Sequence, residues 1–303
     1  MTNPPDRLGV VLDLIDPSLP VLIAGPTASG KSTLALALAE AQGGVIVNAD
    51  AIQVHSDWRI LTARPSKADE ARARHALYGH VAGDQPYSVG AWLREVTPLL
   101  SKGKERVIIT GGTGLYFTAL TEGLAQIPPI PAKIRSLCDW KRAQEGLEAL
   151  VAELDAPTRA RIDLQNPARV ARAWEVLQAT GQGLIQWQED MPPPLLPPDQ
   201  AQPLLLEAPK DWLTPRIEAR FAQMIEQGVL DEARANLASW SADRPSAKAI
   251  GARELMAHLG GEISLSEAAT RATIQTRQYA KRQRTWFRAR MKNWQRLNMA
   301  ELA

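Results

Sequence analysis

The chain has 303 residues, 45% hydrophobic and 22% charged, which is enough apolar content for a folded core and a length typical of about two domains. Its single cysteine, Cys138, excludes an internal disulfide and a cysteine-based zinc site, and the four histidines show no metal-ligand spacing. Such cysteine usage fits the reducing cytoplasm. No apolar run is long enough to span a bilayer and no signal-peptide pattern is present, so we expect no membrane association.

The net charge is only +2, but the charges are unevenly distributed along the chain. Residues 268–300 contain nine Lys or Arg and no Asp or Glu. The rest of the chain therefore has 26 basic and 33 acidic residues, a net charge of −7. A basic C-terminal segment on an acidic body suits a polyanionic partner, although a solvated helix face produces the same pattern.

The first part of the chain alternates short apolar runs with helical patterns, after an arm at residues 1–19 that we expect to be irregular. The predicted elements are strands at 21–24, 44–50 and 107–110, and helices at 32–41 and after Thr113 through Leu120. This alternation predicts parallel βαβ units in an α/β sheet.

Two proline-rich stretches divide the rest of the chain. The first is at 127–131, and the second places five prolines between Met191 and Pro198, where no helix can continue. The segment between them has helical patterning and no clear strand. We therefore predict a small all-helical insertion domain at 132–190, within a core formed by residues 1–131 and 191–303.

The C-terminal part begins with a short strand at 203–207, and we expect its remainder to be helical. Ser264-Leu265-Ser266-Glu267 fits a capping box that starts a long last helix. A basic stripe follows this helix at steps of three and four residues, formed by Arg277, Lys281, Arg284, Arg288 and Lys292.

One segment between a predicted strand and a predicted helix matches the phosphate-binding pattern G-x-x-x-x-G-K-[ST]. It consists of Gly25, Pro26, Thr27, Ala28, Ser29, Gly30, Lys31 and Ser32. The glycines allow backbone N–H groups to close around a diphosphate, Lys31 adds a cation, and the Ser32 hydroxyl can hold Mg²⁺. This segment predicts a phosphate site but does not identify the phosphate compound.

Two further strand ends carry residues suited to chemistry. Asp50 follows the second strand and suits either a magnesium ion, an acceptor substrate or a cap on a following helix. The third strand ends in Thr110-Gly111-Gly112-Thr113, where an NTPase usually has its magnesium-binding Asp, so the NTPase interpretation is weakened. The Gly-Gly-Thr-Gly turn suits a second set of anion donors or a close helix contact.

Six segments, taken together, resemble the tRNA dimethylallyltransferases, also called tRNA isopentenyltransferases, over roughly residues 20–290. The segments are GPTASGKS at 25–32, ADAIQV at 49–54, GGTGLY at 111–116, NPARVARA at 166–173, IGARE at 250–254 and RQYAKRQRTW at 277–286. The resemblance implies a P-loop NTPase-like parallel sheet flanked by helices. The chain departs from the family's usual residues at Ala51, His55 and Ala252.

The resemblance also implies a reaction. The N6 amine of adenosine 37, beside the anticodon, attacks C1 of dimethylallyl diphosphate, and diphosphate leaves in an Mg²⁺-dependent step. The P-loop would then hold a prenyl diphosphate, with Thr27 near the reacting carbon and Ser32 on the metal. Lys31, Thr113 and Arg253 would stabilise the charge on the leaving group.

On the acceptor side, the resemblance implies that Asp50 accepts a hydrogen bond or proton from the adenine amine. Gln53 would read an edge of the base, because a bidentate amide suits adenine, although a solvated polar residue is the plainer interpretation. The expected tRNA contacts in the core are Asp50, Ala51, Ile52, Gln53, Thr113, Lys281, Arg284 and Arg288. Those in the insertion domain are Arg135, Ala168, Arg169, Val170, Ala171 and Arg172.

Three other functions compete with this one: an enzyme that prenylates free adenine nucleotides, a P-loop kinase, and a P-loop RNA-binding protein without chemistry. The insertion domain and the basic last helix favour a tRNA carrying A36 and A37 over a free nucleotide. The retained Asp50, Thr113 and Arg253 favour an enzyme. We take a monomer as the default oligomeric state.

Overall fold

The computed structural model describes residues 7–101 and 105–302, which form two compact units. The larger unit comprises the described residues up to Thr121 and from Leu196 onward, and the smaller unit comprises Glu122–Leu195. The predicted insertion at 132–190 lies inside the smaller unit, which also includes the proline-rich stretch at 127–131 and part of the second one.

The larger unit is built on a six-stranded sheet with the order β3-β2-β4-β1-β5-β6, in which all neighbouring strands run parallel. The strands are β1 (Val21–Ala24), β2 (Val45–Asn48), β3 (His75–Ala76), β4 (Val107–Gly111), β5 (Gln202–Glu207) and β6 (Gln295–Asn298). The predicted parallel α/β sheet is therefore confirmed. Because the strands are parallel, the segments that follow β1, β2 and β4 all emerge at the same edge.

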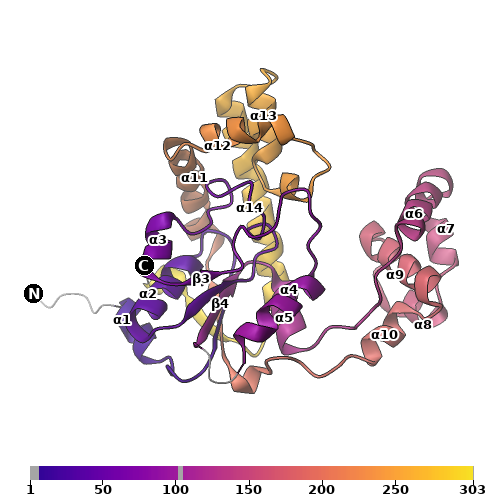
Figure 1. Ribbon diagram of the computed structural model, residues 1–303, viewed down its shortest axis with the longest axis horizontal. Helices are drawn as coiled ribbons and strands as arrows, with labels where there is room; N and C mark the ends of the chain where they lie inside the picture. Colours follow the sequence, from indigo (N-terminus) through magenta and orange to yellow (C-terminus); the bar gives the residue numbers. More distant parts are fainter. Residues whose placement is uncertain (1–6, 102–104, 303) are drawn as a thin grey trace, which may run out of the picture. The chain divides into compact units, whose positions relative to one another are not determined.

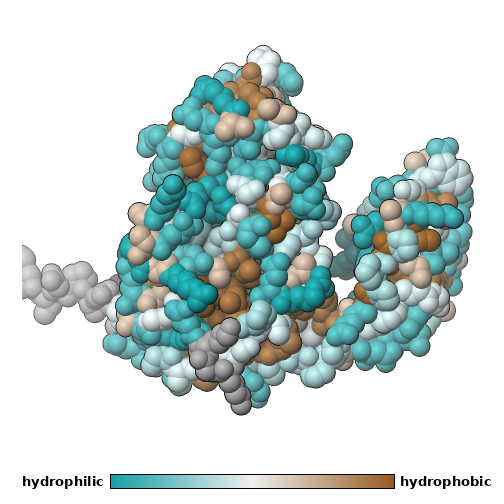
Figure 2. All heavy atoms as spheres, viewed as in Figure 1, coloured by the Kyte–Doolittle hydropathy of each residue, from teal (hydrophilic) through white to brown (hydrophobic). Residues whose placement is uncertain are grey.

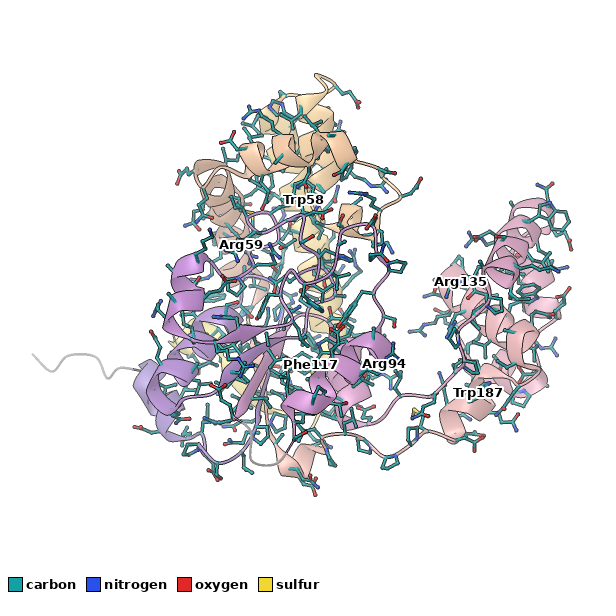
Figure 3. The ribbon with its side chains drawn as sticks, in the orientation of Figure 1. Trp58, Arg59, Arg94, Phe117, Arg135 and Trp187 are labelled. Carbon is teal, nitrogen blue, oxygen red and sulfur yellow. The ribbon has the colours of Figure 1, made fainter. Side chains whose placement is uncertain are left out.

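Helices cover both faces of this sheet (Figure 1). Alternate residues of the buried strands belong to separate hydrophobic cores on the two faces. One face is covered by α1 (Arg7–Asp13) and α2 (Lys31–Gln42), whose Leu34 and Leu38 are buried against Ile23. The other face is covered by α4 (Val89–Val96), α5 (Gly114–Thr121) and the end of α14 (Leu265–Arg290). Phe117 of α5, labelled in Figure 3, is fully buried there.

Two expectations about the larger unit are wrong. The arm at 1–19 is not wholly irregular, because α1 forms within it and both Val11 of this helix and Ile15 after it are buried; residues 1–6 lie outside the described part. The end of the chain is not wholly helical, because β6 pairs with β5, and Arg296 forms an ion pair with Glu207 at 2.6 Å. The sequence Gln-Arg-Leu-Asn of β6 is polar, so an edge strand of this kind leaves no hydrophobic pattern.

A second layer of helices from the C-terminal part packs around Trp58 (Figure 3). These helices are α11 (Lys210–Glu226), α12 (Val229–Asn236), α13 (Ala252–Leu259) and the first half of α14. Ser264 caps α14, because its side chain accepts a hydrogen bond from the Glu267 N–H at 3.1 Å. The predicted capping box is only half formed, because the Glu267 carboxylate pairs with Arg271 instead of the Ser264 backbone. The remaining elements of this unit are α3 (Lys67–Arg72), α15 (Met299–Leu302) and short 3₁₀ helices at Thr97–Leu99, Pro198–Gln200, Leu237–Ser239 and Pro245–Lys248.

The smaller unit is all-helical, as predicted. Its helices are α6 (Ala132–Glu145), α7 (Leu147–Ala152), α8 (Ala156–Arg161), α9 (Pro167–Thr180) and α10 (Leu184–Glu189). It has its own core, in which Cys138, Leu150, Val170 and Trp174 are buried together. Trp174 donates its indole N–H to Glu153 at 2.6 Å, so the polar atom of this core residue is satisfied.

Within the described part of the chain, no helix combines the length and the apolar character needed to cross a bilayer. The face shown in Figure 2 is mostly hydrophilic, with small and scattered hydrophobic areas.

The turn after β4 generates a stability prediction. A Cβ atom on Gly111 would lie 2.1 Å from the Ala49 carbonyl oxygen, a backbone atom that cannot move aside. We expect Gly111→Ala to lower the free energy of unfolding by about 2 kcal/mol or more, because overpacking at this point forces the backbone apart. Gly260→Ala is the matched control, since its nearest contact would be an ordinary 3.4 Å. Equal urea midpoints for the two variants would contradict the prediction.

Candidate functional site

A cavity of about 590 Å³ opens at the carboxyl edge of the sheet in the larger unit. Segments far apart in the sequence form its wall: the loop after β1, the turn after β2, the loop after β4, and helices α11 and α14. In an open parallel sheet this edge is where ligands bind.

The loop between β1 and α2 has the geometry of an anion-binding turn. Gly30 has a φ of 88° and Ala28 a φ of 62°, and this left-handed backbone leads directly into the first turn of α2. The strand–loop–helix context predicted for residues 25–32 is therefore observed. Ser29 and Thr110 also line the cavity, and their buried hydroxyls have no hydrogen-bond partner among the described residues. Unpaired buried hydroxyls are costly, so a polar ligand at this wall would stabilise them.

Lys31 is the cation of this loop. Its Nζ donates to the Pro26 carbonyl at 2.6 Å, and burial lowers the pKa of Lys31 to about 7. Asp50 opposes this shift, and the cation Arg220 adds to it. Near neutral pH the free site thus holds its lysine close to the point of losing its charge, which an incoming anion would restore.

Asp50 lies in the turn that follows β2 and lines the cavity. Its backbone is held by Asn48, which accepts the Asp50 N–H at 2.9 Å and donates to the Asp50 carbonyl at 3.0 Å. One carboxylate oxygen, Oδ1, accepts hydrogen bonds from the Ile52 and Gln53 N–H groups, at 2.9 and 3.4 Å. Asp50 therefore caps a turn, not a helix, and is rigidly placed on the cavity wall.

Thr113 supports this turn from behind. Its hydroxyl accepts the Ala51 N–H at 2.9 Å, and its own N–H donates to the Ala49 carbonyl at 3.2 Å. Among the described residues, the cavity wall includes Gly112 but not Thr113. The structure thus brings Thr113 to the segment that carries Asp50, and not to the phosphate loop where the resemblance implied it.

Gln53 lines the cavity, but its amide nitrogen is already occupied. Nε2 donates to the carbonyls of Thr62 and Ala63, at 2.8 and 3.2 Å. The expected bidentate pairing with adenine needs the same N–H donors, so it is not available in this arrangement. Gln53 instead holds the loop at 62–63 against the site.

Arg253 does not line the cavity, so in this structure it does not lie where it could stabilise a leaving group bound at Lys31. Its side chain is exposed and donates to the Ala242 carbonyl at 2.9 Å. Arg220 of α11 instead lines the cavity, with Nη1 at 3.5 Å from the Thr27 hydroxyl. Burial lowers the pKa of Arg220, and Asp50 counteracts this shift.

Sequence reasoning missed Arg220 and also Gln283 of α14, another residue of the cavity wall. The four-residue spacing of Arg216 and Arg220, which both line the cavity, was the available signal for one face of α11. Spacing alone does not say which face of a helix turns toward a site.

The glycines of the Gly-Gly-Thr-Gly turn make room for α14. A Cβ atom on Gly112 would lie 2.3 Å from Nε2 of Gln283, and one on Gly114 would lie 2.1 Å from the ring of Trp286. The close-helix interpretation of this turn is therefore confirmed.

The basic residues of α14 lie on different surfaces. Lys281 is exposed, and Arg277 forms an ion pair with Glu218 at 3.4 Å. Arg284 and Arg288 line a second cavity of about 340 Å³, which touches the phosphate loop at Pro26. The predicted stripe also ends early, because α14 stops at Arg290, before Lys292.

In the smaller unit, helix α9 starts at a cap in which Asn166 accepts the Arg169 N–H at 3.2 Å. Ala168, Arg169 and Arg172 are exposed, and Ala171 is half-buried. Val170 is fully buried in the core, so its expected contact with RNA is wrong in this arrangement. Arg135, labelled in Figure 3, is exposed on α6. It helps to lower the pKa of Arg172, after the larger effect of burial, so the two cations lie near each other.

A bound metal would have oxygen ligands in this cavity. The described residues contain no cluster of three or more His, Cys, Asp and Glu side chains that would hold a metal by themselves. Ser32, exposed at the start of α2, and Asp50 both line the cavity.

Comparisons with known proteins agree with one another. The family model for IPP transferase matches residues 53–290, and the model for isopentenyl transferase matches residues 20–78. The tRNA dimethylallyltransferase of Dinoroseobacter shibae is 63% identical over 285 residues, covering 93% of this chain and 96% of that protein. Its counterpart from Paracoccus denitrificans is 60% identical over 289 residues, covering 94% and 96%.

Solved structures show the same likeness. The full-length tRNA isopentenylpyrophosphate transferase of Bacillus halodurans is 30% identical, with a TM-score of 0.65 over 92% of this chain and 89% of that one. A eukaryotic dimethylallyltransferase acting on tRNA is 22% identical and shares the fold, with a TM-score of 0.78 over 92% of this chain and 73% of that one.

The low pKa of Lys31 generates a prediction for anion binding. At pH 8 the free lysine is mostly neutral, so binding of inorganic diphosphate should draw a proton onto it. Affinity should then fall as the pH rises above 7. Calorimetry in two buffers of different ionisation enthalpy measures the proton uptake. Lys31→Arg, which stays charged, is the control that removes the contribution of Lys31 and leaves that of the ligand. Equal uptake by both proteins would exclude this role.

Diphosphate binding also tests which arginine, Arg220 or Arg253, contributes to the anion site. Arg220→Met should weaken the affinity by about tenfold or more, since a charged hydrogen-bonding partner is lost from a buried wall. Arg253→Met should leave it within about twofold, because this side chain is exposed outside the cavity. Thermal unfolding checks that both variants are folded. A loss confined to Arg253→Met would reverse the assignment.

Proposed function

The chain belongs to the tRNA dimethylallyltransferase family, and on this basis we propose that it transfers the dimethylallyl group of dimethylallyl diphosphate to N6 of adenosine 37 in tRNA. The observation that supports this most is the single cavity lined by the phosphate loop, Lys31, Arg220 and Asp50. It places groups suited to a departing diphosphate and a carboxylate suited to an amine on one wall. The cysteine usage fits a reaction in the cytoplasm.

The phosphate loop and two cations act on the leaving group. Backbone N–H groups at the start of α2 and the cations Lys31 and Arg220 would receive the diphosphate as the C1–O bond breaks. Because these groups are held in place before the reaction, one well-placed donor can contribute roughly 3–4 kcal/mol of transition-state stabilisation. The diphosphate would also raise the low pKa of Lys31 and keep the lysine protonated.

Asp50 acts on the attacking amine. The lone pair of the adenine N6 is delocalised into the ring, so the amine is a weak nucleophile until a carboxylate accepts one of its protons. Oδ1 of Asp50 is engaged by the turn, whereas Oδ2 lies 3.4 Å from the position of a Cβ on Gly112, at the cavity wall. As the N6–C1 bond forms, the amine proton passes to this carboxylate and diphosphate departs.

Thr27 and Thr113 have different parts in this arrangement. The Thr27 hydroxyl, beside Arg220, would contact the donor near its reacting carbon. Thr113 would act through the turn at 49–53 by holding Ala51, and thereby set the position of Asp50.

Magnesium fits the donor set of the cavity. The Ser32 hydroxyl offers an oxygen ligand, and Mg²⁺ commonly combines one or two protein oxygens with phosphates and water. When bound, the ion would neutralise charge on the diphosphate.

We propose that basic residues of both units bind the tRNA. Arg135, Arg169 and Arg172 would contact the tRNA backbone from the smaller unit, and Lys281, Arg284 and Arg288 from α14. The exposed Ala168 and the half-buried Ala171 border the arginines of α9. The target base must leave the stack of the anticodon loop to enter the cavity.

A labelling experiment tests the proposal. Purified protein, Mg²⁺ and labelled dimethylallyl diphosphate are mixed with unmodified tRNA carrying A36 and A37, and separately with AMP. Label on tRNA that maps to A37 would support donor, acceptor and reaction together. Label on AMP alone would favour an enzyme acting on free nucleotides, and label on neither, with tight ATP binding, would favour a kinase.

Asp50→Asn isolates the carboxylate in the same assay. The amide oxygen can still accept from Ile52 and Gln53, so the turn should keep its shape. We expect turnover to fall by about 10²–10⁴, the range of general-base contributions, with the Kd for tRNA changed by less than about threefold. Turnover close to that of the wild type would show that Asp50 does not act on the amine.

A further inference from the structure

We infer that Gln283, on the buried side of α14, is a positioning residue that sets the phosphate loop against the turn carrying the acceptor carboxylate. The inference rests on the proposed function and adds to it a residue that acts through its hydrogen bonds to two loops of the cavity wall. Its side chain is only 5% exposed, and it lies where three segments of the cavity wall meet.

Both ends of the Gln283 amide are used. Oε1 accepts the N–H of Thr27 in the phosphate loop at 2.9 Å, and Nε2 donates to the carbonyl of Gly112 after β4 at 2.9 Å. The two partners lie 256 and 171 residues away in the sequence. One buried side chain therefore ties together the two loops that follow neighbouring strands β1 and β4.

The bond to Thr27 changes what the phosphate loop offers to its ligand. Because the Thr27 N–H points to Gln283, it is not directed at a phosphate, and the donors left for the diphosphate come from later residues of the loop. The same bond fixes the backbone of Thr27, whose hydroxyl lies 3.5 Å from Arg220. Gln283 thus orients the residue proposed to lie nearest the reacting carbon.

The other end of the amide borders the acceptor side. The point where a Cβ atom of Gly112 would stand is 2.3 Å from Nε2 of Gln283 and 3.4 Å from Oδ2 of Asp50. The amide and the carboxylate therefore flank the same glycine. The spacing between the donor loop and Asp50 is set through Gln283, and a shift of about 1 Å in such a spacing can reduce turnover by about a hundredfold.

Tyr279 belongs to the same arrangement. It lies one turn earlier on α14 and also lines the cavity. Burial, and next Asp50, raise the pKa of Tyr279, while its hydrogen bond with Gln283 acts in the opposite direction. Tyr279 therefore lies next to the Gln283 amide on the same helix.

The test compares two variants of Gln283 with a matched control on the same helix. Gln283→Met keeps the length of the side chain and removes both hydrogen bonds. We expect the KM for dimethylallyl diphosphate to rise about tenfold and kcat to fall about tenfold, with the KM for tRNA unchanged within about twofold. Gln278→Met, the same substitution at an exposed position of α14, should match the wild type.

Gln283→Glu adds a pH signature. Burial beside Asp50 should raise the pKa of the new carboxyl, and when protonated it can accept from Thr27 and donate to Gly112 as the amide does. The ratio of kcat/KM for Gln283→Glu to kcat/KM for the wild type should be near one at about pH 6. It should fall toward the ratio for Gln283→Met at about pH 9. The ratio for Gln283→Met should stay flat. If Gln283→Glu recovers its kcat/KM at low pH, the test still holds even when the Met variant fails to fold.

Three results would overturn the inference: an unchanged donor KM in Gln283→Met, equal changes in the KM values of donor and tRNA, or a ratio for Gln283→Glu that does not depend on pH. Failure of the proposed function is distinguishable, because the wild type would then put no label on tRNA. The affinity of Gln283→Met for inorganic diphosphate, measured by calorimetry without turnover, would still test the positioning role. We expect that affinity to be about tenfold weaker than in the wild type.

Discussion

The site depends on keeping two cations, Lys31 and Arg220, in a cavity where burial disfavours their charge. The pKa of both groups is lowered by burial, and the nearby Asp50 opposes the shift for each. The charged forms of these buried cations are unfavourable when the cavity is empty and are stabilised when it holds an anion. The same two cations therefore favour both the binding of the diphosphate and its departure as a leaving group.

The geometry of the cavity follows from the parallel sheet. Strands β1, β2 and β4 deliver the phosphate loop, the Asp50 turn and the Gly-rich turn to one edge, and backbone hydrogen bonds of Ala49 with Thr110 and Thr113 hold two of these segments together. Helix α14 then closes the arrangement, since Gln283 and Trp286 pack over Gly112 and Gly114. Backbone contacts and one buried amide, more than side-chain ion pairs, keep the reacting groups in register.

The smaller unit contributes a different kind of surface. Its core is complete by itself, around Leu150, Val170 and Trp174, and Arg135, Arg169 and Arg172 are exposed on its surface. Such exposed cations suit a phosphate backbone, where binding is tuned by salt and not by desolvation. In the proposed function, the larger unit carries out the chemistry and the smaller unit provides many of the contacts with tRNA. This difference follows from the difference in burial of their cations.

The sequence by itself determined the local features of this protein. The phosphate loop, the parallel α/β pattern, the all-helical smaller unit and the Ser264 cap of α14 each depend on residues close together in the chain, so their physics is readable there. Only the tertiary structure decided that Arg220 and Gln283, 193 and 256 residues from Thr27, join the site and that Arg253 does not. Which face of a helix turns inward, and which polar strand such as β6 pairs at an edge, is set by packing between distant segments, and spacing along the chain carries no record of it.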